Sequence, residues 1–252
     1  MIDFRKQLVQ QLSIDYNCSV EDINSPYPIL TEKRYHKDRR IFWGDDGILK
    51  LVCVNGKIVV SVQKELLGWC EKNLMDLSAA WFFDYHHLKL IDEEITRFGH
   101  KIEHCRHYYL PSKKILIPEM RYEVNWYEEK ELFQFKGDQR FKNALSFLKE
   151  SPDMLAVTAI ENGEILGMAG ASADSETMWQ IGIDVTECGR GKGIGRYLTM
   201  LLKNEIIKRG VTPFYGTAES HIKSQRVAVT SGFIPAFAEL YTKGVKKEET
   251  LE

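Results

Sequence analysis

Short apolar segments alternate with turn signals along the second half of the chain, and this pattern predicts a β-sheet. Asn162-Gly163 separates two of these segments, and an Asn-Gly pair between apolar runs is a strong signal for a tight hairpin. Interleaved with helices, the segments predict an α/β class with a mixed α+β sheet. The expected strands are 121–128, 155–160, 165–172, 177–185, 213–220 and 233–242.

Apolar residues three or four positions apart predict three helices between these strands. The first is expected over 138–151, with Asp138 at its start. The second, over 193–210, is ended by Gly210, and a shorter helix follows over 221–232. One apolar stripe runs along the second helix and consists of Ile194, Leu198, Leu201, Leu202 and Ile206.

The first half of the chain has its own mixed set of elements. Residues 1–12 are amphipathic and predict a helix. Two apolar runs at 48–62 surround Asn55-Gly56 and predict another hairpin. Further expected elements are helical segments over 64–83 and 86–99 and an extended segment over 101–111.

A proline-containing stretch, residues 111–119, is the expected crossover between the two halves. We therefore predict an N-terminal α/β domain of unknown role at 1–112 and a second domain at 113–252.

Composition bounds the function without identifying it. Of the 252 residues, 44% are hydrophobic and 28% are charged, and the net charge is −2, which gives no global attraction to nucleic acid or to an anionic membrane. No apolar run approaches the length of a membrane span, and the start lacks an apolar signal core, so we expect a cytoplasmic protein. The five cysteines are widely spaced without a CxxC pair, which favours reduced thiols over disulfides or a zinc site.

A glycine-rich stretch, ECGRGKGIGRYL at 187–198, lies between a predicted strand and the long helix. It has neither the P-loop spacing, because Gly193 stands where Ser or Thr is needed, nor the spacing G-x-G-x-x-G. Glycines permit a tight turn and a close ligand, and a helix N-terminus offers unpaired amides with a positive dipole. The loop alone leaves two interpretations open, a phosphate-binding loop or a solvated turn.

The order of the motifs resembles the GNAT superfamily of acyl-CoA N-acyltransferases. Four residues after a strand that ends at Val185, RGKGIG at 190–195 resembles the acyl-CoA motif of that family. HIKSQRVAVTSGF at 221–233 resembles its second signature. The likeness covers residues 120–243 and implies a C-terminal GNAT fold. The chain as a whole also resembles the bacterial branch that includes the zwittermicin A resistance acetyltransferase.

The resemblance implies direct transfer of an acetyl group from acetyl-CoA, a co-substrate, to an amine, without a metal. It implies that the loop amides hold the pyrophosphate of CoA. The strand before the loop would bind the pantetheine arm and polarise the thioester carbonyl through its backbone, and a serine of the second signature would lie nearby. The implied CoA-binding residues are Ile183, Asp184, Val185, Arg190, Gly191, Lys192, Gly193, Ile194, Gly195, Arg196 and Ser224.

The catalytic acid and base are less well marked, because the sequence departs from the family pattern. His221 replaces the Asn of the second signature, and Ala228 stands where many relatives carry a tyrosine acid. We predict Glu219, at the end of a strand beside the expected cleft, as the base. Tyr241 and Tyr215 are candidates for the acid. The alternative for Glu219 is an exposed carboxylate or a helix-capping partner, and His221 is interpreted as a capping side chain.

Other conspicuous residues are interpreted as structural. HKIEHCRH at 100–107 is rich in histidine, but its spacing does not match a helical zinc pair and it looks extended, so no metal site is predicted. Cys188 has no indicated base and is a bystander in the loop. The side chain of Asp184 is expected to point to solvent. An aromatic cluster assigned to the N-terminal core consists of Trp69, Trp81, Phe82, Phe83 and Tyr85.

Two functions from different classes fit these observations. The first is an N-acetyltransferase acting on a small primary amine, as a monomer or homodimer, with no nucleic-acid or membrane partner. The second is a non-catalytic, GNAT-like module that binds acyl-CoA as a sensor, which the missing tyrosine keeps open. Release of CoA thiol with a panel of amines separates the two. A nucleotide-phosphate site is disfavoured by the failed spacings.

Overall fold

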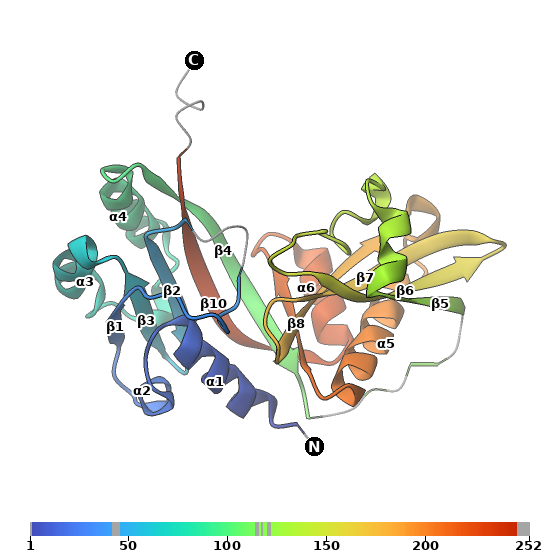
Figure 1. Ribbon diagram of the computed structural model, residues 1–252, viewed down its shortest axis with the longest axis horizontal. Helices are drawn as coiled ribbons and strands as arrows, with labels where there is room; N and C mark the ends of the chain where they lie inside the picture. Colours follow the sequence, from blue (N-terminus) through green and yellow to red (C-terminus); the bar gives the residue numbers. More distant parts are fainter. Residues whose placement is uncertain (1, 42–45, 114–115, 117, 120–121, 246–252) are drawn as a thin grey trace, which may run out of the picture. The chain divides into compact units, whose positions relative to one another are not determined.

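The chain forms two compact units, whose elements are labelled in Figure 1. The first unit comprises Met1–Gln7 and Tyr108–Pro235, and the second comprises Leu8–His107 and Ala236–Glu252. The predicted domain boundary at residue 112 stays a prediction. The structure, a computed structural model, describes residues 2–41, 46–113, 116, 118–119 and 122–245.

Two strands, β4 (His100–Pro111) and β10 (Phe233–Gly244), contribute residues to both units. None of the helices in the described part of the chain has the length and hydropathy of a membrane span. Five short 3-10 turns are η1 (Lys64–Leu66), η2 (Ala79–Trp81), η3 (Glu129–Phe135), η4 (Gln139–Phe141) and η5 (Glu187–Gly189).

In the second unit the strand order is β1-β3-β2-β10-β4. Strand β1 is parallel to β3, whereas β2 is antiparallel to both β3 and β10. The remaining strands are β1 (Ile29–Glu32), β2 (Leu49–Val54) and β3 (Lys57–Val62). The helices, of which the first begins in the other unit, are α1 (Phe4–Asp15), α2 (Val20–Asn24), α3 (Leu67–Leu74) and α4 (Tyr85–Thr96).

Most of the N-terminal predictions are confirmed. The turn between β2 and β3 has Asn55 at φ 53° and Gly56 at φ 79°, the left-handed pair that a type I′ hairpin requires. The helix predicted over 64–83 is wrong in its extent, because only α3 within it is α-helical. The expected crossover at 111–119 lies partly outside the described residues.

The aromatic cluster is only partly core. Phe82 is fully buried, and Trp69 and Phe83 pack against the buried cluster of this unit. Trp81 and Tyr85 are 67% and 78% exposed, so their assignment to the core is wrong. They stand on either side of the turn into α4, and residues so close in sequence cannot all face one core.

A buried ion network joins three segments of this unit. The Arg40 guanidinium donates to Asp15 and to Glu239, with nitrogen–oxygen distances of 2.6 Å in both cases. The hydroxyl of Tyr16 also donates to Glu239. Charges so deeply buried persist only when paired, so these contacts fix α1 and β10 to the segment that carries Arg40.

In the first unit the strand order is β4-β9-β8-β7-β6-β5. Strands β5 to β8 are antiparallel neighbours, whereas β8 and β9 are parallel. Helix α5 packs on β6, β7 and β8 (Figure 1). The elements are β5 (Glu123–Glu128), β6 (Asp153–Glu161), β7 (Glu164–Ala173), β8 (Met178–Val185), β9 (Thr212–Thr217), α5 (Ile194–Lys208) and α6 (Ile222–Thr230).

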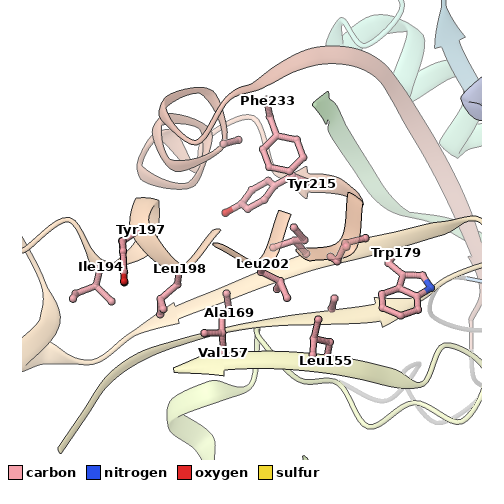
Figure 2. Packing of buried hydrophobic residues seen from close by; sticks show 14 of the residues in the cluster. Leu155, Val157, Ala169, Trp179, Ile194, Tyr197, Leu198, Leu202, Tyr215 and Phe233 are labelled. Carbon is pink, nitrogen blue, oxygen red and sulfur yellow. The ribbon is translucent and has the colours of Figure 1, made fainter. Parts of the chain in front are cut away.

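The core of this unit forms where the stripe of α5 meets the sheet. Figure 2 shows Leu198 and Leu202 over the strand residues Val157 and Ala169. Four residues of the predicted stripe are buried, and Leu201 is half-buried at its margin. The periodicity therefore predicted both the helix and the face that it buries.

Residues 138–151 do not form the predicted amphipathic helix and contain only the 3-10 turn η4. The apolar spacing is real, but carboxylates take the backbone amides that a helix would use. Asp153 accepts from the amides of Ser146 and Phe147, and Asp184 accepts two more. An amide bound to a carboxylate is not available to the carbonyl four residues earlier.

The same segment lies directly on two glycines of the sheet. A Cβ on Gly170 would overlap the carbonyl oxygen of Ala144, and one on Gly182 would overlap that of Asn143. Because both strands present bare backbone here, the irregular segment packs closer than a helix with side chains could. Periodicity carries no information about this contact.

Gly182→Ala is expected to lower the free energy of unfolding by about 1–3 kcal/mol, because the methyl group overlaps the backbone of Asn143. Gly68→Ala is the matched control. Gly68 lies in α3 with open space around its Cα, so alanine there should be neutral or stabilise by up to about 1 kcal/mol. Urea unfolding of both variants tests this; equal stabilities would contradict the contact.

Candidate active site

The strands β8 and β9 stop pairing before either strand ends. Their parallel register runs from Met178 opposite Thr212 to Ile181 opposite Tyr215, whereas β8 continues to Val185. On its other edge β8 stays paired with β7 as far as Val185. In the described chain, the last residues of β8 therefore present one backbone edge that β9 does not occupy.

The glycine loop begins where β8 ends and is fastened to β7. Both the amide and the hydroxyl of Thr186 donate to the carbonyl of Leu166. Gly189 is buried against the same carbonyl, and a Cβ there would overlap it. Glycine is therefore required at 189 for packing rather than for a ligand.

Gly191 and Gly193 have a different role. Both have positive φ, 77° and 79°, and a Cβ on either would meet open space. Positive φ at these positions turns the chain into α5, with Gly193 as the N-cap residue. Since the space beside them is empty of protein atoms, a ligand can approach the loop backbone there.

The first amides of α5 are oriented away from the helix. Within the described residues, no backbone carbonyl accepts from the amides of Gly193, Ile194, Gly195 or Arg196, and the first helical bond runs from Tyr197 to Gly193. With the positive end of the helix dipole, these amides form a site suited to an anion.

The loop cations are already paired with carboxylates. Lys192 Nζ lies 2.5 Å from Glu161 Oε2, and Arg190 lies 3.7 Å from the exposed Glu187. Arg196 Nε donates to the carbonyl of Thr230 at the end of α6. The Arg196 side chain thus ties α5 to α6, and only its amide is oriented with those of the loop.

The three β8 residues implied by the resemblance divide between the two faces of the strand. Ile183 and Val185 pack toward α5, near the Cα of Gly195. Asp184 accepts from the amides of Asn143 and Ala144 at 2.7 and 2.9 Å. The expectation that the Asp184 side chain points to solvent is therefore wrong, since it anchors the irregular segment to β8.

Ser224 pairs with a buried tyrosine. Its Oγ lies 2.8 Å from the hydroxyl of Tyr215, the last β9 residue in register with β8. The Tyr215 ring is buried beside Phe233, as Figure 2 shows. Burial raises the pKa of Tyr215 to about 12, so the phenol is protonated at neutral pH and can donate a proton or a hydrogen bond.

The two predicted catalytic residues lie in different units. Glu219 is exposed just after β9, and its carbonyl accepts a hydrogen bond from Gln225 of α6. Tyr241 lies on β10 in the other unit, where its hydroxyl bonds to Glu239. Burial raises the pKa of Glu239, and both Arg40 and this hydrogen bond oppose that effect. The structure does not bring Glu219 and Tyr241 together.

Two further interpretations concern side chains around this site. His221 occupies the N-cap position of α6, but its side chain makes no capping hydrogen bond, so the capping interpretation is wrong. Cys188 is an exposed, free thiol in the loop. No group of three potential metal ligands occurs among the described residues, which include the histidine-rich segment 100–107 of β4.

Sequence reasoning missed two residues that contact the loop. Glu161 pairs with Lys192, and the hydroxyl of Tyr122 donates to the Lys192 carbonyl. Both are distant from the loop in sequence, so only the strand register brings them there. The one available signal is the Asn162-Gly163 turn, which immediately follows Glu161.

Residues 116–233 match the profile of a family described as the acetyltransferase (GNAT) family. The match spans the split strands, the loop and both helices of the first unit. A search of curated proteins found none that matches. The predicted fold class is confirmed: a mixed α+β sheet with a GNAT fold and an additional N-terminal region. The family match supports acyl transfer as the general chemistry and a fold that binds acyl-CoA.

Solved structures with the same general fold include several GCN5-related N-acetyltransferases. The one from Sphaerobacter thermophilus is 12% identical, with 97% of this chain and 93% of that chain covered and a TM-score of 0.48. The one from Kribbella flavida is 11% identical, with 98% of each chain covered and a TM-score of 0.46. A GCN5-related N-acetyltransferase-like protein from Streptococcus suis is 15% identical, with coverages of 77% and 84% and a TM-score of 0.45.

Asp184→Asn is expected to lower the free energy of unfolding by about 1–3 kcal/mol, because an amide replaces a carboxylate that accepts from two backbone amides. Amide hydrogen exchange at Asn143 and Ala144 should accelerate. Glu187→Gln, which neutralises an exposed carboxylate nearby, should stay within about 0.5 kcal/mol of the wild type. Unchanged exchange at the two amides would contradict an anchoring role for Asp184.

Proposed function

We propose that the protein is an acetyl-CoA-dependent N-acetyltransferase that acts on a primary amine of a small molecule. The observation that carries this proposal is the early end of the β8–β9 pairing, immediately before a glycine loop that opens α5. A free strand edge and an anion site at a helix N-terminus lie next to one another in sequence. An extended donor with a phosphate group at one end fits both.

The amides of residues 193–196 would bind the pyrophosphate of acetyl-CoA. Gly191 and Gly193 leave the approach open, since no protein atom lies near their missing Cβ atoms. The backbone of residues 183–185 would hydrogen-bond the pantetheine arm along the unpaired edge of β8. Ser224, held by Tyr215, lies on the helix that follows β9.

The transfer would be direct, because the chemistry requires only an amine, a thioester and two proton transfers. Backbone amides of β8 would stabilise the negative charge that develops on the thioester oxygen. Glu219 would accept the proton of the attacking amine. For the acid that protonates the leaving thiolate, Tyr241 remains the prediction, and Tyr215 has the support of a position in the same unit as the loop.

The acceptor is proposed to be a small primary amine, because no long acidic or basic surface tract in the sequence marks a protein tail as substrate. We further propose a cytoplasmic monomer or homodimer of bacterial type, without nucleic-acid or membrane partners. Placement in the branch of the zwittermicin A resistance acetyltransferase stays a prediction.

A second candidate function is a non-catalytic sensor of acyl-CoA. The observation that favours it is Ala228, which is buried in α6 where many GNAT relatives carry a tyrosine. Binding of acyl-CoA without turnover of any amine would decide for this candidate.

Gly193→Asp should weaken binding of acetyl-CoA and CoA by at least about 100-fold, because it places a carboxylate beside the proposed pyrophosphate site. Isothermal titration calorimetry measures this directly. Gly210→Asp is the matched control, since Gly210 also has positive φ, 83°, and open space but ends α5 at the opposite end. A wild type that binds neither ligand would remove the proposed function.

Glu219→Gln should lower kcat for a reactive amine by about 100-fold or more and leave the dissociation constant of CoA unchanged, because the base acts on the amine alone. Release of CoA thiol, followed with a chromogenic thiol reagent, gives both rates. Glu219→Asp should recover part of the activity. If the glutamine variant keeps full activity, Glu219 is an exposed carboxylate without a catalytic role.

A further inference from the structure

Lys192 is held at two points by residues outside the glycine loop. Its ammonium group lies 2.5 Å from the carboxylate of Glu161, and its carbonyl accepts from the hydroxyl of Tyr122. The Tyr122 ring also packs beside that of Tyr197, with 5.8 Å between the ring centroids. The middle of the loop is thus attached to the β5–β6 edge of the same unit.

Strand register explains why these two residues reach the loop together. Glu123 of β5 is opposite Ile160 of β6, so the preceding Tyr122 and the following Glu161 are neighbours at the ends of adjacent strands. The β6–β7 turn starts after Glu161, and β7 is the strand to which the loop is fastened through Leu166. Three consecutive strand ends therefore surround Lys192.

The Glu161–Lys192 pair is close but not buried. The side chains of Glu161 and Lys192 are 43% and 40% exposed. The hydrogen bond with Glu161 raises the pKa of Lys192, so the ammonium stays charged throughout the neutral range. A half-exposed pair of this kind contributes little stability and can be exchanged for another anion. Its effect is therefore expected on binding rather than on folding.

We propose that Glu161 competes with the phosphate oxygens of acyl-CoA for Lys192 and so sets the affinity of the site and the rate at which product CoA leaves. This inference rests on the proposed function, because it takes the loop as the phosphate site. When a phosphate binds, Lys192 either leaves Glu161 or stays shared with it. In both cases the carboxylate weakens binding, by competition in the first and by repulsion in the second.

Glu161→Gln is expected to tighten CoA binding by roughly three- to tenfold, mainly through slower dissociation, since a surface charge pair changes an equilibrium constant by about this factor. Calorimetry gives the affinity, and stopped-flow displacement of CoA by excess acetyl-CoA gives the dissociation rate. Glu164→Gln is the matched control: it removes the same charge from the same hairpin, where Glu164 is exposed and pairs across the turn with Glu161. This control should change the affinity by less than about twofold.

A double-mutant cycle separates competition for Lys192 from a general charge effect. Lys192→Gln alone should weaken CoA binding, and Glu161→Gln added to it should restore much less than Glu161→Gln gains in the wild type. Raising the ionic strength should reduce the gain as well. Thermal unfolding of all four proteins verifies that they are folded to the same extent.

The outcomes distinguish this inference from the proposed function. If the wild type binds no CoA, both fail. If it binds CoA but Glu161→Gln has the affinity and dissociation rate of the wild type, only the inference on Glu161 fails. Equal gains in Glu161→Gln and Glu164→Gln, or an undiminished gain in the Lys192→Gln background, would also overturn it. A selective gain that depends on Lys192 supports it.

Discussion

The parting of β8 from β9 after Ile181 and Tyr215 is the constraint on which the rest of the first unit depends. A strand that loses one neighbour keeps its place only if the other neighbour and the packed helix hold it. Here β7 remains paired to Val185, and α5 packs on the side chains of Ile183 and Val185. The glycine loop then begins from a fixed strand end, so the amides of α5 have a fixed direction.

The irregular segment on the opposite face of β8 follows from the same requirement. Asp184 and Asp153 bind its amides, and Gly170 and Gly182 give it a flat place on the sheet. A strand with only one neighbour along its end gains a further contact through Asp184. Stability of the site and irregularity of this segment are thus consequences of one arrangement.

Nearly every strand and helix could be predicted from the sequence, because hairpin turns and apolar stripes are local signals. The 138–151 helix could not, since the carboxylates and glycines that displace it come from other strands. The glycine loop was recognisable from its own residues, but the contact of Lys192 with Glu161 depends on strand register. Trp81 and Tyr85 show the same limit, because composition marks them as core and backbone direction exposes them.

The second unit is discontinuous in the chain, and this has a consequence for synthesis on the ribosome. Its strand β10 lies between β2 and β4, yet most of β10 is made only after residue 235. All residues of the first unit, by contrast, have been synthesised by then. Since contacts form only between residues already made, the first unit can complete its fold during translation, whereas the second needs the last strand. The buried partners Asp15 and Arg40 therefore wait for Glu239 through almost the whole of translation.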